Sequence, residues 1–551
     1  MTFRFVLAAA CTLIPMTLTA QFLDPNVLKK PNPVDAWPTY HGDYSGKRYS
    51  ELTQINKSNV ATLTLAWAFT AKASADSATS VGGPWKPGDP TYWGGPSDSF
   101  RIAGSPLMVD GIMYISAMDR AWAVNARTGE QIWSYFFRTR GGHHFNGNKG
   151  LGMYGNWLYL VTPDAYLVSL DAKTGKERWY KQLAPVEMDY YGSTAPLVVG
   201  NHVYTGIGGD ALDLQGYLEA RNPETGDVQW KWYSTPQNPG DPGYDSWPDD
   251  YSRKHGGGGP WQPLTYDPAL NLIYVTTGNP NPVGATQSRK GDNLYTCSVV
   301  ALNADTGKMA WYFQTSPHDS HDWDSTEVPV LFDGTWEGKP RKLLAIAARN
   351  GYFFVLDRAT GQNLLTKPFL DPEFMTWSKG INAKGQPIPD PKKEASLGGT
   401  LVLPLSGGTN WPPPTFSPQT GLFYVGTTES LSMTYLVDTS DHPEGYGFTG
   451  GPAGSAGGRN GLRAIDYHTG QLKWMHEGGG PQGLLSTAGG LLFGHDGSHN
   501  FCAFDAATGK ILWHHWMPVL PTNGPQTYMI DGHQVVTVAA QDTVYMFMLN
   551  R

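Results

Sequence analysis

The sequence predicts an all-β fold, an eight-bladed β-propeller with tryptophan-docking repeats. Its composition is the first indication, because the 551 residues include 66 glycines and 42 prolines, are 13% aromatic and are only 16% charged. Glycine, proline and aromatic residues at this level suit turns and short strands rather than long helices. Since 40% of the residues are hydrophobic, the chain has enough apolar surface to bury a core and does not have a disordered composition.

A repeated phrase is the second indication. An apolar strand ends in a polar turn that carries Thr-Gly, and a tryptophan follows the glycine by four residues, as in Ala123–Trp133. The glycines of the phrase stand at positions 129, 175, 226, 307, 470 and 509, and a seventh copy at Asp357–Leu365 has leucine in place of tryptophan. Such a phrase predicts a β-hairpin whose tryptophan packs against a neighbouring repeat. The shortest spacings, about 40 to 50 residues, match one four-stranded blade, so seven phrases and one degenerate blade predict eight.

Two terminal segments are the third indication, because a ring of blades must close. The apolar segment Thr62–Phe69 and the final apolar runs Val535–Ala539 and Val544–Met548 are the natural closing pair. We therefore predict one propeller over residues 37–551, preceded by an extended N-terminal segment over residues 21–36.

Residues 1–20 resemble a secretory signal peptide, with Arg4 before an apolar run and a small residue, Ala20, at the end. A membrane anchor is the alternative, but Thr12 and Pro15 interrupt the apolar run, which falls short of about 20 clean apolar residues. The sequence thus predicts an exported, periplasmic protein with no membrane span once the leader is removed.

The charge and the cysteines exclude several classes of function. A net charge of −8 disfavours binding to a phosphate backbone, so no nucleic-acid partner is expected. Beyond the predicted leader only Cys297 and Cys502 remain, which excludes a disulfide framework and a zinc ribbon, and no C-x-x-C-H haem motif is present.

Three carboxylates crowd into six residues at Asp319, Asp322 and Asp324. A hard cation that polarises a carbonyl needs oxygen ligands, and a base that takes a hydroxyl proton needs a nearby carboxylate. A solvated turn capped by aspartates would explain the same pattern. Residues alone leave both interpretations open.

The tryptophan phrases, Arg48–Asn56, Ser316–Asp324 and Arg349–Gly351 together resemble the pyrroloquinoline quinone (PQQ) dependent alcohol dehydrogenases, or quinoproteins. The resemblance spans nearly the whole chain beyond residue 20. It implies that a small alcohol or polyol is oxidised with PQQ and with calcium or a lanthanide ion. It also implies that a separate exported cytochrome accepts the electrons, since no haem motif is present.

The resemblance assigns roles residue by residue. Asp322 falls where the family has its catalytic base, and Arg349 matches the cation beside the quinone oxygens. Trp261 matches the floor beneath the cofactor, and Asn279 and Asp324 match metal ligands, Asp324 being typical of the lanthanide branch. The remaining cofactor contacts implied are Lys149, Ser193 and Asn410. The alternatives are a blade-packing tryptophan at 261, an Asn-Pro turn at 279 and a surface arginine at 349.

The sequence also departs from the family pattern. Ala211 stands where the resemblance implies a glutamate that ligates the metal, so Asp210 or Asp213 could serve only if the loop shifts or the ion moves. The adjacent cysteine pair is replaced by His143-His144, and further departures fall at Ala103, Lys149 and Pro481. A cofactor-less propeller that acts as a binding or scaffold protein is therefore the alternative function. A third hypothesis is a different enzyme that binds a transition metal through His143, His144, His318 and His321.

Overall fold

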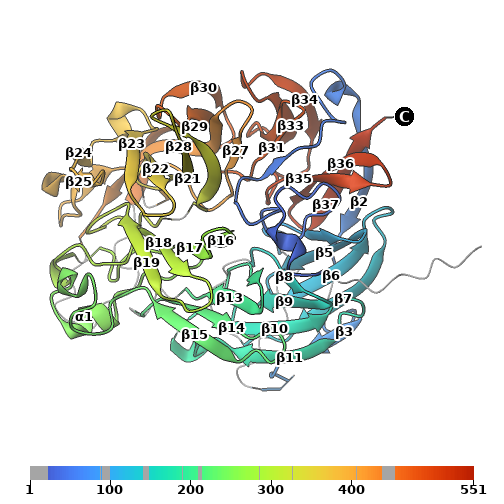
Figure 1. Cartoon of the computed structure of the whole chain (residues 1–551), viewed down its shortest axis with the longest axis horizontal. Helices are drawn as coiled ribbons and strands as arrows, with labels where there is room; N and C mark the ends of the chain where they lie inside the picture. The colour runs from blue at the N-terminus through green and yellow to red at the C-terminus, as the bar shows by residue number, and fades with distance from the viewer. Residues whose placement is uncertain are drawn as a thin grey trace, which may run out of the picture.

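The structure of the chain is a computed structural model, and its residues form a ring of β-sheets (Figure 1). It describes residues 23–72, 74–86, 88–89, 100–140, 148–188, 190–208, 214–284, 286–325, 327–404, 406–436 and 453–550. Within these ranges, eight sheets have four strands or more, and β24 and β25 form a separate two-stranded sheet. The eight-bladed propeller predicted from the sequence is confirmed.

The first four blades follow the chain in order, each an antiparallel meander. Their strands are β4 (Leu107–Val109), β5 (Ile112–Ala117), β6 (Arg120–Asn125) and β7 (Gln131–Phe137), with β3 (Ser80–Gly82) added beside β7; β8 (Gly152–Tyr154), β9 (Trp157–Val161), β10 (Tyr166–Asp171) and β11 (Glu177–Gln182); β12 (Leu197–Val199), β13 (His202–Gly206), β14 (Tyr217–Arg221) and β15 (Val228–Tyr233); and β16 (Thr265–Asp267), β17 (Leu272–Thr276), β18 (Ser298–Asn303) and β19 (Met309–Gln314).

The last four blades complete the ring. Their strands are β20 (Val330–Trp336), β21 (Lys339–Ala347), β22 (Tyr352–Asp357) and β23 (Asn363–Pro368); β27 (Thr415–Ser417), β28 (Leu422–Thr434), β29 (Ala453–Asp466) and β30 (Leu472–Glu477), with β26 (Thr400–Val402); β31 (Leu485–Thr487), β32 (Leu491–His495), β33 (Asn500–Asp505) and β34 (Ile511–Trp516), with β1 (Tyr49–Ser50); and β35 (Gln526–Ile530), β36 (His533–Ala540), β37 (Thr543–Leu549) and β2 (Leu63–Thr70). The small sheet pairs β24 (Ser378–Ile381) with β25 (Pro387–Pro389).

Helices are few in the described part of the chain. The α-helix α1 (Asp250–Lys254) starts after Asp249, whose carboxylate accepts the amide hydrogen of Ser252 and so caps the helix N-terminus. Short 3-10 turns lie at Val27–Lys29, Val60–Thr62, Val186–Met188, Tyr244–Ser246, Thr286–Ser288, Pro372–Phe374 and Pro391–Lys393. A membrane-crossing helix, which would have to be both long and apolar, does not occur in the ranges that the structure describes.

The repeated phrase joins each blade to the next. The indole N–H of Trp133 in β7 donates to the carbonyl of Ala172, at 3.0 Å, and the indole ring lies on the turn at Gly175 of the second blade. A Cβ at Gly175 would come within 2.5 Å of that ring, and the residue adopts a φ of +67°, so both space and backbone require glycine. At the copy with leucine, the side chains of Leu365 and Lys367 lie beside Gly470. The predicted docking is confirmed.

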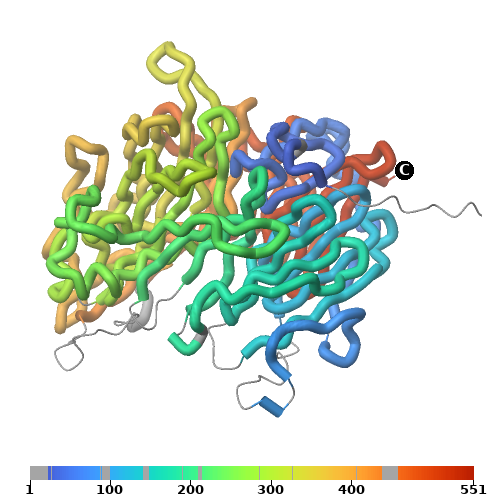
Figure 2. The backbone as a smooth tube through the Cα atoms, turned by 60° about the horizontal axis from the view of Figure 1, so that its bottom comes forward, coloured from blue at the N-terminus to red at the C-terminus, as the bar shows by residue number. Residues whose placement is uncertain are grey.

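The ring closes between the two ends of the chain, as predicted. Strand β2 pairs antiparallel with β37, from Leu63 opposite Leu549 to Thr70 opposite Thr543. Figures 1 and 2 show this blue strand beside the red C-terminal strands. Trp67 of β2 then docks on Gly129 of the first blade, and Trp513 of β34 donates to the carbonyl of Leu63. The closing blade thus uses Trp67, which lies outside a Thr-Gly phrase.

The first strand of each blade lies toward the axis and the fourth toward the outside. In the third blade β12 is fully buried, whereas β15 consists of exposed and half-buried residues. Since the strands are antiparallel, the start of a first strand and the end of a second strand meet at the same end of the ring. Residues that precede first strands and residues that follow second strands are therefore neighbours in space.

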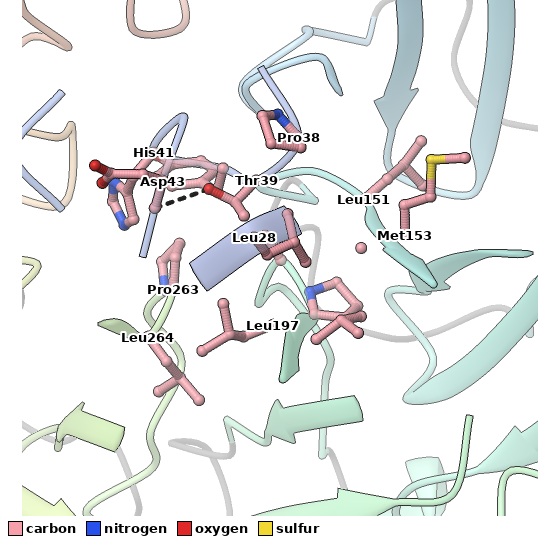
Figure 3. A pocket seen from close by; sticks show the side chains of 15 residues that line it. Leu28, Pro38, Thr39, His41, Asp43, Leu151, Met153, Leu197, Pro263 and Leu264 are labelled. Atoms are coloured by element: carbon pink, nitrogen blue, oxygen red, sulfur yellow. Dashed lines mark hydrogen bonds between the residues drawn. The ribbon is translucent and has the colours of Figure 1, made fainter. Parts of the chain in front are cut away.

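The segment that precedes the propeller packs onto it. Leu23 bridges to Gly155 through two backbone hydrogen bonds, and the buried Leu28 lines a small cavity with Leu197, Met153 and Pro263 (Figure 3). The predicted leader, residues 1–20, lies outside the described residues.

Candidate functional site

The sequence-predicted site residues gather at one end of the ring because of the strand order. Lys149, Ser193 and Trp261 each precede the first strand of a blade, and so do Asp322 and Asp324 before β20. Residues that follow second strands reach the same end, namely Asn279 after β17 and Arg349 after β21. Four blades thus supply these residues, and Asn410, which precedes β27, comes from one more.

Asp324 lies at the centre of this site and is 3% exposed. One carboxylate oxygen accepts the indole N–H of Trp261, at 2.7 Å, and the other accepts the backbone N–H of Asn279, at 2.5 Å. Burial raises the pKa of Asp324, an effect opposed by Arg349 and by these hydrogen bonds. Asp324 therefore fixes Trp261. The alternative interpretation, in which Trp261 is a blade-packing tryptophan, does not describe this contact.

Asp322 and Arg349 form an ion pair beside it. An Nη of Arg349 lies 3.0 Å from a carboxylate oxygen of Asp322 and also donates to the Asp322 carbonyl, at 2.7 Å. The second Nη lies 3.8 Å from the carboxylate of Asp324. Asp322 adopts a φ of +64°, an uncommon conformation for a residue with a side chain. Since Arg349 is 7% exposed, the interpretation as a surface arginine is wrong.

Lys149 brings a further buried cation to the site. Its ammonium group donates to the hydroxyl of Ser193, at 3.1 Å, and lies 4.5 Å from the centre of the Trp261 ring and 5.6 Å from that of Trp411. Burial lowers the pKa of Lys149 to about 7, and the charges of Arg101 and Arg349 add to the effect. The lysine thus lacks a compensating anion among the described residues.

Asn279 and Asn410 are held partly by their own turns. The side-chain amide of Asn279 donates to the carbonyl of Pro280 and to the side chain of Asn281. The side chain of Asn410 donates to the Ser406 carbonyl and accepts the N–H of Trp411. Their roles toward a metal ion and a cofactor therefore stay predictions.

Asp319 has a structural role that the turn interpretation anticipated in part. Its oxygens accept the backbone N–H groups of His321 and Trp323, so it caps the turn that carries Asp322. The carboxylate is 3% exposed, however, and burial raises its pKa to about 6. The turn is capped by aspartate, but it is buried rather than solvated.

His318 and His321 do not converge on a metal position. A ring nitrogen of His318 lies 2.6 Å from the carbonyl of Gly291, and one of His321 lies 3.1 Å from the carbonyl of Lys393. Burial lowers the pKa of His321 to about 4. The other two histidines of that hypothesis, His143 and His144, lie outside the described residues, as do Asp210, Ala211 and Asp213.

The two halves of the expected cofactor site differ in how well the described residues fit them. Two buried cations, Lys149 and Arg349, with the hydroxyl of Ser193 and the face of Trp261, fit a planar aromatic acid that carries several carboxylates. No three histidine, cysteine or acidic side chains in the described ranges converge closely enough to hold a metal ion. Both oxygens of Asp324 already accept protein N–H groups, so those ranges alone do not complete a metal site.

Two residues near the site escaped the sequence reasoning. Trp411 directly follows the predicted Asn410, and its ring faces Lys149. Glu327 stands three residues after Asp324 and is fully buried. An acid directly before the apolar run Val328–Phe332 was the available signal for Glu327.

Comparison with known proteins identifies the family. The family model described as "PQQ: Glucose/ethanol/alcohol dehydrogenase, beta-propeller domain" matches residues 37–369 and 468–536. The chain belongs to this family. A quinohemoprotein alcohol dehydrogenase of Comamonas testosteroni is 32% identical over 97% of this chain and 76% of its own length. Quinoprotein alcohol dehydrogenase PedH of Pseudomonas putida is 34% identical over 90% of this chain and 84% of its own.

Solved structures of PQQ-family dehydrogenases share the fold of this chain. The crystal structure of the Comamonas testosteroni enzyme superposes with a TM-score of 0.82 at 30% identity, over 96% of this chain and 82% of that one. A europium-containing methanol dehydrogenase gives a TM-score of 0.77 at 29% identity, over 93% of this chain and 90% of that one. The family resemblance predicted from the sequence is confirmed.

Proposed function

We propose that the protein is an exported, periplasmic PQQ-dependent dehydrogenase that oxidises a small alcohol or polyol. The observation that carries the proposal is the buried arrangement of Asp322, Arg349, Lys149 and Trp261 at one end of a propeller of this family. Fold alone would not suffice, because propellers host many functions.

Lys149, Arg349, Ser193 and Trp261 would hold the cofactor. The ammonium and guanidinium groups match its carboxylate and quinone oxygens, and the indole face offers a stacking surface. The Lys149 ammonium lies 4.5 Å from the centre of that ring. A carboxylate of the cofactor would supply the anion that Lys149 lacks among the described residues.

Asp322 would act as the general base. The ion pair with Arg349 favours its ionised form, which is the form that accepts the proton of the substrate hydroxyl. Arg349 donates hydrogen bonds to the backbone carbonyl oxygen of Asp322 and to one of its carboxylate oxygens, and so fixes the direction of the carboxylate. PQQ, when bound, would supply the acceptor for the hydride, which carries both electrons that the alcohol loses.

A calcium or lanthanide ion is part of the proposal, with Asn279, Asp322, Asp324 and Asp210 as its ligands. The name of the europium-containing relative supports it. The described residues do not complete the ligand set, and the proposed roles of Lys149, Arg349 and Asp322 do not depend on the ion. A separate exported cytochrome is the proposed electron acceptor.

Titration of the purified protein with PQQ, alone and with calcium or lanthanum, tests the proposal. We expect saturable binding, monitored through the change in quinone absorbance. We also expect metal-dependent oxidation of short alcohols with an artificial dye as electron acceptor. A cooperatively melting protein that binds PQQ with neither ion would overturn it. That outcome would favour the cofactor-less binding or scaffold propeller, for which the Lys149 ammonium over the Trp261 face is the supporting observation.

A further inference from the structure

Glu327 is a buried acid close to the site that the roles above do not use. It lies between Asp324 and β20, and its side chain has no exposed surface. Burial raises its pKa well above the ordinary value of 4.5, and the charge of Arg349 opposes the effect. A buried carboxylate without a compensating partner is costly, so the protonation state of Glu327 has to be established from its contacts.

The hydrogen bonds of Thr409 provide that account. The Thr409 hydroxyl oxygen lies 2.8 Å from the carbonyl of Gly426 and 2.9 Å from a carboxyl oxygen of Glu327. A hydroxyl has one hydrogen to donate, and a carbonyl can only accept. Both contacts are hydrogen bonds when Thr409 donates to Gly426 and Glu327 donates to Thr409. This arrangement requires a protonated Glu327.

The second oxygen of Glu327 leads to the same state. No hydrogen-bond donor from the described residues reaches it. An ionised carboxylate would leave this oxygen charged and unpaired, whereas a neutral acid has a carbonyl or hydroxyl oxygen there at smaller cost. The charged and titratable groups that influence Glu327 are Arg349, and Tyr40, whose pKa the Glu327 charge in turn raises.

Arg349 explains why the charge state of Glu327 affects the site. Its guanidinium already pairs with Asp322 and lies near Asp324. The backbone around Arg349 packs on the segment that carries Thr409, since the Gly408 N–H donates to the Arg349 carbonyl, at 2.7 Å. An ionised Glu327 would be a third carboxylate attracting the same guanidinium and would disturb Thr409 as well.

We propose that Glu327 is a neutral positioning residue: protonated, it holds Thr409 in place and leaves Arg349 committed to Asp322. Its effect on catalysis rests on the proposed dehydrogenase function, whereas its protonation does not. Glutamine reproduces the neutral acid, because its NH2 group can donate to Thr409. Glu327→Gln is therefore the informative variant.

Thermal unfolding of the full chain from pH 5 to 9 tests the protonation. Unfolded Glu327 ionises near its ordinary pKa of 4.5 while the folded residue keeps its proton, so folding of the wild type weakens as pH rises above that value. Glu327→Gln lacks this loss. We expect its Tm relative to wild type to rise with pH, corresponding to about tenfold in the unfolding equilibrium per pH unit.

The matched control is Glu429, a second glutamate without exposed surface. It lies 2.7 Å from Arg463 and 2.5 Å from Arg459, so it is a buried member of ion pairs. Glu429→Gln should lower the Tm throughout, because it removes the buried carboxylate that Arg463 and Arg459 share and leaves them only Asp371 as an anionic partner among the described residues. A Glu327→Gln variant that behaves like Glu429→Gln, or a difference from wild type that does not change with pH, would overturn the proposal.

Two further measurements keep the test decisive. Infrared spectra of wild-type protein with ¹³C-labelled glutamate side chains should show the band of a protonated carboxyl group at pH 7. This measurement does not require that the variant folds, and absence of the band would overturn the proposal. In PQQ-loaded enzyme, the ratio of Glu327→Gln to wild-type kcat/KM should rise toward alkaline pH, and a constant ratio would refute the positioning role. If PQQ does not bind, the melting and infrared results still decide the protonation.

Discussion

The docked tryptophans, here called the outer belt, and the site around Asp322, Arg349 and Lys149, here called the axial site, differ in whether their contacts repeat around the ring. The belt repeats one contact around the ring, an indole on a turn glycine with the indole N–H bonded to the next blade, as for Trp133 on Gly175 and Trp474 on Gly509. The axial site has no repeat. Asp322 and Arg349 come from the fifth blade and Lys149 from the second, and each makes contacts found once among the described residues.

The difference shows where this protein tolerates change. At one belt position leucine replaces tryptophan and still packs beside Gly470, so the ring survives the loss of an indole. At the axis, the lowered pKa of Lys149 and the raised pKa of Asp324 show that groups are held in costly environments. Binding and catalysis commonly use such groups. The belt should therefore govern stability, and the axis should govern activity.

Asp322→Asn sharpens this contrast most. The change removes the proposed base and keeps the size of the side chain, so we expect turnover of the PQQ-loaded enzyme to fall by about 10²–10⁴-fold. The Tm should change by only a few degrees. Steady-state oxidation with a dye acceptor and a melting curve measure the two quantities. A variant with near-normal turnover would remove Asp322 from the mechanism.

Trp133→Ala should have the reverse effect. The indole is 2% exposed and fills the contact with the second blade, so its loss should cost about 3–5 kcal/mol of unfolding free energy. Leu365→Ala is the matched change at the leucine position and should cost less, because that side chain is smaller and half-buried. Denaturant unfolding compares them. Equal costs would mean that the indole adds nothing specific to the belt.

Lys149 gives the smallest effect, and it depends on pH. With a pKa near 7, Lys149 must take up a proton to pair with a carboxylate above that pH, so wild-type affinity for PQQ should fall by up to about tenfold per pH unit there. Below pH 7 this dependence should disappear. Lys149→Arg, whose guanidinium stays charged, should bind with little change between pH 7 and 9. Parallel wild-type and variant titrations would contradict the assignment.

Much of the fold could be predicted from sequence because its determinants are local. The Thr-Gly turn and the tryptophan four residues later lie within one hairpin. Because the same short phrase recurs, it identifies seven blades. The closing pair β2 and β37 followed from its apolar pattern and from the need to close a ring. Asp322, Asp324, Trp261 and Arg349 could be grouped because they sit in motifs that resemble one family.

Only the tertiary structure decided which of these residues meet and in what state. Trp261 contacts Asp324 across 63 residues and Glu327 contacts Thr409 across 82, because separate blades place their ends at one end of the ring. Burial then sets the protonation, and it is a property of the assembled ring rather than of any segment. The sequence determined the blades through local patterns, whereas the charges at the axis depend on long-range neighbours that no local pattern encodes.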